Sequence, residues 1–219
     1  MSAFPGSPRV LAGGIILVDP GSGAVQRTIA FQYNPDTMTR TLKAEAIGPE
    51  SGDRLEATRL KGAPVETIKL DAELDATDQL EFPDQNPEVV QYGLHPQLAM
   101  LELITYPSST SVQDNINLAS VGTIEILPME APLALFAWGA TRIVPVRLTD
   151  LSITEEAFDP NLNPIRAKVG LTMQVLNVND LGVGAWGTSV FMAYHQRKEQ
   201  LAGLGPATSL AALGITRIL

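Results

Sequence analysis

The chain contains no cysteine among its 219 residues. This absence excludes disulfide bonds, thiol nucleophiles and cysteine-ligated zinc together. Histidine is nearly as scarce, because only His95 and His195 occur and they lie far apart in the chain. A lone histidine on a helix is usually structural or solvated, so we expect these two to form neither a metal site nor a catalytic site.

Long hydrophobic runs are also missing near the start of the chain. The apolar run at residues 14–18 is too short for the core of a signal peptide and far too short to span a bilayer. We therefore expect synthesis and first use in the cytoplasm, without direct membrane insertion. The apolar content of 45% is nevertheless enough to bury a real core.

Basic residues are scarce in one part of the chain. Residues 45–88 contain 12 acidic and four basic side chains, which gives 4 − 12 = −8 of the net charge of −9. Such a surface repels phosphates, so we expect no nucleic-acid partner. The acidic residues could face a basic partner, but a solvated surface is the favoured interpretation.

The acidic side chains do not form a convincing catalytic group. Glu155 and Glu156 are neighbours on a predicted strand, so their side chains point to opposite faces and do not pair for acid/base work. Asp71, Glu73 and Asp75 share one strand face, which would suit a weak cation site or, more simply, a solvated face. We predict no catalytic residue, no cofactor and no metal, and hence no enzyme.

Several stretches predict β-strands. A hairpin is expected around the turn "DPGSG" near the start of the chain. Strict alternation predicts a strand at residues 65–74 with one wet face. A long hairpin is expected at residues 142–175 around the turn "DPNLNP". Its return arm has one apolar face made of Ile165, Ala167, Val169, Leu171, Met173 and Val175. Further strands are predicted at residues 123–128 and 131–139.

Other stretches predict helices and loops. Residues 86–106 favour a helix in two pieces, with Pro96 in a first turn and with Leu98, Leu101 and Leu103 directed toward a core. Residues 44–63 and 108–122 are expected to be polar loops. A last helix is expected at residues 189–201, capped by Thr188 or Ser189. The apolar tail after Gly205 has no strong structural signal.

Three stretches together resemble the tube-adaptor branch of the contractile injection system tube proteins, relatives of phage tail-tube and baseplate-hub proteins. They are "IAFQYNPDTMTRTL", "GLHPQLAMLELITYP" and the run from "LFAWG" through "IVPVRLTDLSITEEAFDPNLNPIRAKVGLTMQV". The resemblance implies a β-rich (α+β) fold, a tail-tube-like antiparallel β-barrel or sandwich at residues 1–180 with a flanking helix. Residues 181–219 would form a C-terminal helical docking extension.

The resemblance also implies a function. Adaptors of this kind form a homohexameric ring between the central spike protein and the first ring of inner-tube protein, in contact with other baseplate subunits. The particle that contains them is cytoplasmic or released. Many adaptors continue into a C-terminal LysM module, which the 14 residues after Gly205 are too few to form.

Nine residues are predicted to contact neighbouring subunits or partners under this interpretation. They are Phe31, Tyr33, Asn34, Pro35, Asn163, Pro164, Trp186, Phe191 and Tyr194. Two alternatives stay open at this point. The chain could be an inner-tube subunit of the same particle, or a monomeric β-barrel that binds a small ligand.

Overall fold

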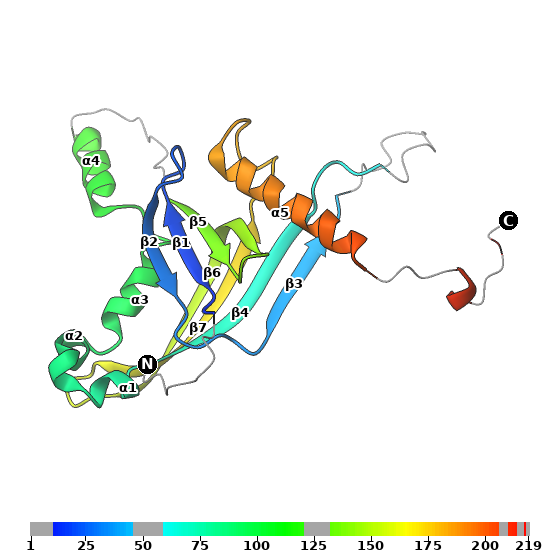
Figure 1. The fold of residues 1–219 in the computed structure, drawn as a ribbon. Helices are drawn as coiled ribbons and strands as arrows, with labels where there is room; N and C mark the ends of the chain where they lie inside the picture. The colour runs from blue at the N-terminus through cyan, green and yellow to red at the C-terminus, as the bar shows by residue number, and fades with distance from the viewer. Residues whose placement is uncertain (1–10, 46–58, 121–131, 206–209, 214–216, 218–219) are drawn as a thin grey trace.

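A single antiparallel sheet organises the chain. The structure is a computed structural model, and it describes residues 11–45, 59–120, 132–205, 210–213 and 217. Within them the strands follow the order β2-β1-β5-β6-β7-β4-β3 (Figure 1). The strands are β1 Gly14–Val18, β2 Val25–Ala30, β3 Met38–Lys43, β4 Val65–Asp75, β5 Leu133–Ala137, β6 Ile143–Phe158 and β7 Pro164–Val175. The predicted β-rich α+β fold class is confirmed.

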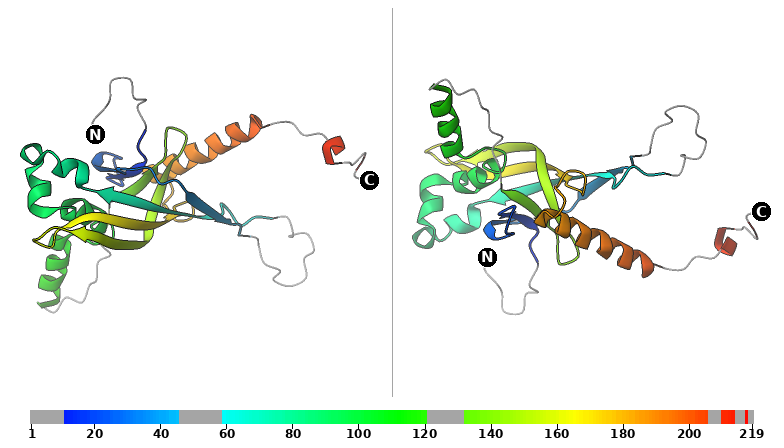
Figure 2. Two further views of the ribbon diagram at one scale, coloured as in Figure 1. Left: turned by 90° about the horizontal axis from the view of Figure 1, so that it is seen from below. Right: turned by 90° about the horizontal axis from the view of Figure 1, so that it is seen from above.

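The helices occupy two places in the chain. Most of them lie in the connection between β4 and β5, whereas α5 follows the last strand (Figure 2). They are α1 Thr77–Leu80, η1 Pro83–Gln85, α2 Pro87–Tyr92, α3 His95–Glu102, α4 Ser109–Ser120, α5 Trp186–Gly203 and η2 Leu210–Leu213. None of the helices in the described ranges combines the length and the apolar character that a membrane crossing requires.

Alternating side chains bury one face of the central strands. Along β4 the predicted apolar face is buried, and its residues pair with the apolar face of β7, as in Ala72 opposite Val169. The other face of both strands stays polar. The strict period of two therefore fixes the register, because a slip of one residue would bury Arg166 and Lys168.

Among the described residues, the two outer strands, β2 and β3, each pair along one side only. The connection between them draws the ends of the sheet toward each other. The side chain of Gln32 accepts a hydrogen bond from the main-chain nitrogen of Asp75 at 2.9 Å and donates one to its carbonyl oxygen at 2.6 Å. The sheet therefore curls around one core, to which both its ends contribute side chains such as Ile15 and Ile68.

The helices α2 and α3 close the end of the core near the β6–β7 turn. Leu98 and Leu101 are buried there, as predicted, and Pro96 stands in the first turn of α3. The prediction for Leu103 is wrong, because this residue follows the last turn of α3 and is 57% exposed. The helix ends too early to turn Leu103 toward the core.

The segment predicted as a polar loop at residues 108–122 is helical instead. It forms α4, and none of its residues is buried. Its Ser, Thr and Asn content weakens any helix signal, because these side chains compete for backbone hydrogen bonds. Two other predictions lie outside the described residues. They are the strand predicted at residues 123–128 and the part 46–58 of the loop predicted at residues 44–63.

The C-terminal helix begins earlier than predicted. It starts at Trp186 after Ala185, and no side chain caps it. The predicted cap Thr188 instead lies inside the first turn, where its hydroxyl donates a hydrogen bond to the carbonyl oxygen of Gly182 at 3.1 Å. The turn formed by residues 177–185 thus fixes the start of α5 without an N-cap side chain.

Candidate functional site

The described residues bring together no His, Cys, Asp or Glu cluster that could hold a metal ion. His95 begins α3, while His195 lies on α5, where its ring stacks on Phe191. Of the three acidic residues predicted to share a face of β4, Asp75 pairs with Arg166 at 2.9 Å. The best-organised polar group of the described chain lies elsewhere, at the contact between α5 and the sheet.

The first half of α5 covers the outer face of β1 and β5. Four buried side chains form a small second core there, with Trp186 and Val190 of the helix packed against it. The buried members are Val18, Leu133, Leu135 and Leu176. Trp186 also packs over Gly23, whose φ of 71° makes the turn between β1 and β2 and where a Cβ would lie 2.4 Å from the indole ring. Trp186 is thus half-buried within its own chain.

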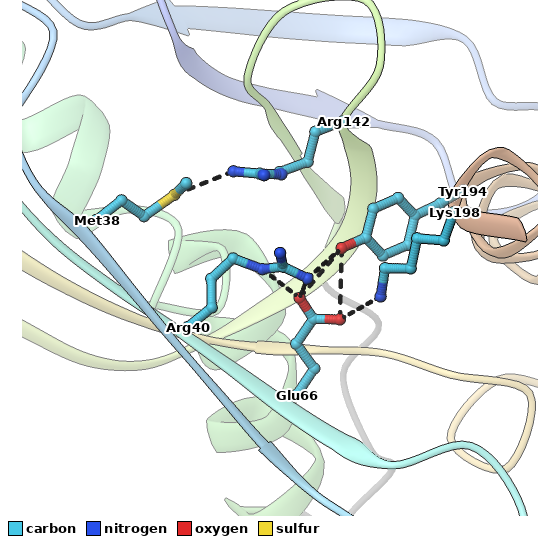
Figure 3. A network of polar contacts seen from close by, with 6 residues as sticks. All are labelled: Met38, Arg40, Glu66, Arg142, Tyr194 and Lys198. Carbon is cyan, nitrogen blue, oxygen red and sulfur yellow. Dashed lines mark hydrogen bonds and ion pairs between the residues drawn. The ribbon is translucent and has the colours of Figure 1, made fainter. Parts of the chain in front are cut away.

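The second half of α5 is fixed by a buried carboxylate. Glu66 of β4 is only 3% exposed, and it receives side chains from two other elements (Figure 3). Arg40 of β3 donates to its Oε1 from Nε at 2.8 Å and from Nη2 at 2.5 Å. From α5, the Tyr194 hydroxyl donates at 3.1 Å and the Lys198 Nζ at 2.9 Å.

The same side chains also contact one another. The Arg40 Nη2 donates to the Tyr194 hydroxyl at 2.9 Å, and the Lys198 Nζ lies 4.0 Å from the centre of the Tyr194 ring. A carboxylate with three donors has its lone pairs well satisfied, which offsets the cost of removing it from water. The Glu66 network, comprising Arg40, Glu66, Tyr194 and Lys198, therefore joins α5 to the edge of the sheet at β3.

Burial by itself would raise the pKa of Glu66, since it disfavours the charged form. The hydrogen bonds and charges of Lys198 and Arg40 outweigh it, so the pKa of Glu66 lies below its ordinary value. The pKa of Arg40 is raised in turn: desolvation would lower it, but Glu66 outweighs desolvation. The network is ionic at neutral pH.

This lowered pKa predicts an acid-sensitive contact. A carboxyl with a depressed folded-state pKa contributes stability that is complete above its unfolded pKa, about 4.3 for glutamate, and is lost as the pH falls through the folded value. We expect Glu66→Gln to flatten the fall in unfolding free energy between about pH 5 and pH 3. Urea titrations of both proteins across that pH window would measure the difference. Parallel curves of unfolding free energy against pH would contradict the assignment, because the other carboxyls with a lowered pKa are present in both proteins.

The predicted interface residues at the β2–β3 corner separate into buried and exposed members. Phe31 is buried in the core. The Asn34 side chain accepts a hydrogen bond from the Gly13 nitrogen at 2.8 Å and donates one to the Leu11 carbonyl at 2.7 Å. These two bonds account for an asparagine at this position. Tyr33 is 47% exposed, and it and Pro35 line an open cleft of about 800 Å³. Tyr33 and Pro35 remain the candidates for contact here.

The predicted residues at the hairpin turn hold neighbouring elements together. Asn163 donates a hydrogen bond to the Gln91 carbonyl at 3.2 Å and another to the Asp159 carboxylate at 2.8 Å. Pro164 is buried, and its carbonyl accepts a hydrogen bond from the Leu94 nitrogen at 2.9 Å. Both residues are occupied by contacts to the α2–α3 corner.

On α5, Phe191 and Tyr194 are buried in the main core, and Trp186 is half-buried. The nine predicted residues thus lie in three separate groups on the structure. The sequence interpretation missed Glu66, Arg40 and Lys198. The alternation of β4 could have pointed to Glu66, because it lies two residues before Ile68 and shares its buried face.

The geometry defines an antiparallel β-sheet protein with a C-terminal helix fixed on the sheet by an ionic network. A sequence profile of the family "contractile injection system tube protein" matches residues 18–180, which is most of the chain, and the protein belongs to that family.

Two further comparisons complete this picture. No curated protein matches the chain significantly in sequence. Among solved structures, the tail of an empty GTA particle refined with C6 symmetry contains a similar chain, with 15% identity and a TM-score of 0.28 over 75% of this chain and 90% of that one. A chain in the virion of a native gene transfer agent particle shows 14% identity and a TM-score of 0.27 over 75% and 91%.

Proposed function

We propose that the protein is the adaptor subunit of a contractile injection particle, forming a hexameric ring that joins the spike to the inner tube and starts tube growth. The observation that carries this proposal is α5. The helix lies beyond the residues that match the tube family, yet the Glu66 network and the second core fix it on the tube fold. A rigid addition to one flank suits a subunit that meets a different partner there.

Ring formation is supported by the two outer strands. Within the described parts of the chain β2 and β3 each pair along one side only, so neighbouring subunits would find main-chain groups available along both ends of the sheet. Rings of this kind bury on the order of 2,000 Å² or more at each contact. The polar outer face of β4 and β7 would then face a channel or a neighbour, while the apolar face of both strands packs in the core.

A second candidate function is an inner-tube subunit that stacks in many copies. The match to the tube family favours it, because the profile covers β2 to β7 and the last residue of β1, and describes tube proteins without distinguishing an adaptor. Under this alternative α5 would contact the next ring of the same protein, and the partners would be other copies of the chain.

Labelling in native particles separates the two functions. We expect an affinity-tagged chain, expressed in its host and captured with its assemblies, to mark one end of sheathed, needle-like particles in electron micrographs. Label along the whole length would make the protein a tube subunit. A tagged protein that is recovered without any particle would overturn both and favour a small β-barrel that acts alone.

A further inference from the structure

The turn of the β6–β7 hairpin carries a large apolar side chain where glycine is the usual residue. Leu162 has a φ of 66° and is 77% exposed. Its nitrogen donates a hydrogen bond to the Asp159 carbonyl at 3.0 Å, and the Asp159 nitrogen donates one to the Asn163 carbonyl at 3.0 Å. Residues 160–162 therefore form a three-residue hairpin loop, whose last position is left-handed and favours glycine. The chain keeps a leucine there at the expense of backbone strain.

The strain is concentrated at this end of the hairpin. Ala157, with a φ of 52°, is the other non-glycine residue with a positive φ in the described ranges. Strained backbone persists where the surrounding structure imposes it, and it collects at binding sites. The Asp159 carboxylate holds the turn in place, because it accepts hydrogen bonds from the nitrogens of Asn161 at 2.7 Å and Asn163 at 2.8 Å. The exposed leucine thus stands on a rigid support, and burial in its own chain does not account for it.

An apolar groove lies beside α5. It has a volume of about 520 Å³ and lies between the first half of α5, the β1–β2 hairpin and the turn between β5 and β6. Val25, Ile143, Trp186 and Val190 are among its lining residues, and Arg197 is the one charged residue that lines it in the described chain. We call this the α5 groove. Val25 is 65% and Ile143 40% exposed, so an apolar side chain seated in the groove would remove both from water.

The turn and the groove lie at opposite ends of one strand. Ile143, which lines the groove, is the first residue of β6, and the turn follows Phe158, the last. The 16 residues of β6 extend over about 50 Å. Figure 2 shows the hairpin turn beside α2 at one end of the molecule and α5 at the other. The turn therefore cannot reach the groove of its own chain, and a contact between the two surfaces joins two molecules.

The charges around the two surfaces are opposite in sign. Residues 77–92, which form α1, η1 and α2, contain four exposed acidic side chains and no basic one. Because Asn163 donates a hydrogen bond to the Gln91 carbonyl at 3.2 Å, these helices flank the turn. The groove carries the cation Arg197. Opposite charges of this kind steer the approach of two surfaces and fix their orientation.

We infer that the β6–β7 turn of one subunit inserts Leu162 into the α5 groove of a second copy of the chain. Such a contact is heterologous, so repeated head to tail it closes a ring or continues as a stack. The inference rests on the proposed assembly of the chain with itself and assigns a contact to it. It also gives the Glu66 network a purpose, because that network fixes the helix that forms one wall of the groove.

The lack of cysteine makes a direct test possible, since two introduced thiols would be unique. Full-length Asn161→Cys/Ala193→Cys places one thiol beside Leu162 and one in the groove. A short bismaleimide crosslinker is expected to join subunits of this variant into a ladder of covalent oligomers. Equal mixtures of the two single-cysteine variants should give crosslinked dimers of one copy of each. Failure to crosslink both in the concentrated protein and in isolated particles overturns the inference.

The length of the ladder tests the proposed function separately. A ladder that ends at six subunits supports a closed ring, and a ladder that runs past six supports the stacked tube subunit. Either ladder supports the contact itself. The matched control moves the second thiol to His195, which is exposed on α5, does not line the groove and points about 200° away from Ala193. Asn161→Cys/His195→Cys is expected to crosslink at least tenfold less, and equal yields for the two pairs overturn the inference.

Replacing the leucine separates assembly from folding. Leu162→Asn, added to the Asn161→Cys/Ala193→Cys protein, is expected to lower the crosslinking yield about tenfold. Its urea midpoint should be at least as high, because asparagine accepts a left-handed conformation more readily than leucine. Leu103→Asn is the matched control, since Leu103 is 57% exposed with an ordinary helical φ of −63°, and it should keep the yield. An unchanged yield with Leu162→Asn, or a lowered urea midpoint, would show that the leucine serves its own chain.

Charge reversal at the groove provides a further measurement. Arg197→Glu is expected to lower the crosslinking yield about tenfold at low salt, because it places a negative charge opposite the acidic helices beside the turn. Raising the salt concentration should narrow that difference, since it screens exposed charges. A reversal that leaves the yield unchanged at low salt would contradict the assigned orientation.

Discussion

An Arg40→Met/Lys198→Met double variant is expected to lose about 3 kcal/mol of unfolding free energy at neutral pH. The substitutions keep an unbranched, flexible side chain at both positions, shorter than the original, and remove the two charges. Glu66 would remain buried with the Tyr194 hydroxyl as its one remaining donor in the network. Arg40 and Lys198 are partly open to solvent, which keeps the expected loss at the lower end for a broken buried pair.

The pH dependence gives this prediction its sharpest form. In the unmodified protein the pKa of Glu66 is lowered, so acidification removes stability. In the double variant burial acts without the opposing cations, and the pKa of Glu66 is expected to rise above its ordinary value. A raised carboxyl pKa costs stability at high pH and returns it as the pH falls. The difference between the two proteins should therefore shrink on acidification.

Two controls separate the charge effect from helix propensity and packing. Arg197→Met changes a cation on the same helix that does not contact Glu66, and it should alter the unfolding free energy by no more than about 0.5 kcal/mol. Adding Glu66→Gln to the double variant should recover part of the loss, since an amide is far less costly to bury than a carboxylate. Guanidinium unfolding of all four proteins measures these free energies. A triple variant with a lower unfolding free energy than the double variant would contradict the network.

The elements that follow a strict local period could be predicted from the sequence. The alternation in β4 and β7 identified the buried faces of both strands, because the polarity of each side chain indicates which face of the strand it occupies. Pro96 marked the start of α3 for a similarly local reason, since its missing amide hydrogen is tolerated in a first turn.

The Glu66 network could not be predicted in this way. Its members come from β3, β4 and α5, and Glu66 is 26 residues from Arg40 and 132 from Lys198. A charged residue in an alternating strand looks the same whether it is solvated or paired, until the register of β3 against β4 places Leu42 opposite Glu66 and Arg40 beside it. The helix α4 was missed for a different reason, because its Ser, Thr and Asn side chains leave only a weak local helix pattern.

The predicted interface residues illustrate the same limit. Aromatic and Asn-Pro positions such as Phe31 and Asn163 stand out in a sequence because they are chemically distinctive. Phe31 is nevertheless a core residue, and Asn163 ties a hairpin turn to a helix. A chemically distinctive residue marks a position with strict structural requirements. The sequence alone does not say whether those requirements come from the fold of the chain itself or from a partner.

Gly93→Ala is expected to cost about 3 kcal/mol or more, because it combines backbone strain with a collision. Gly93 ends α2 at φ 57° and ψ −134°, a conformation that residues with a Cβ rarely adopt. An added Cβ would lie 2.5 Å from the Pro164 carbonyl oxygen and 2.9 Å from the Asn163 Cβ. That carbonyl accepts the hydrogen bond of Leu94, so the collision would push α3 away from the β6–β7 turn.

Gly139→Ala separates the two contributions. Gly139 also has a positive φ, of 69°, but an added Cβ there meets no other atom within 4 Å. We expect it to lose only the strain, about 1 kcal/mol. Thermal and urea unfolding of both variants gives the comparison. If Gly93→Ala costs no more than Gly139→Ala, the α2–α3 corner moves easily against the hairpin, and Asn163 and Pro164 do not anchor it. A larger cost for Gly93→Ala would mean that these two predicted interface residues hold the α2–α3 corner on the hairpin within the chain.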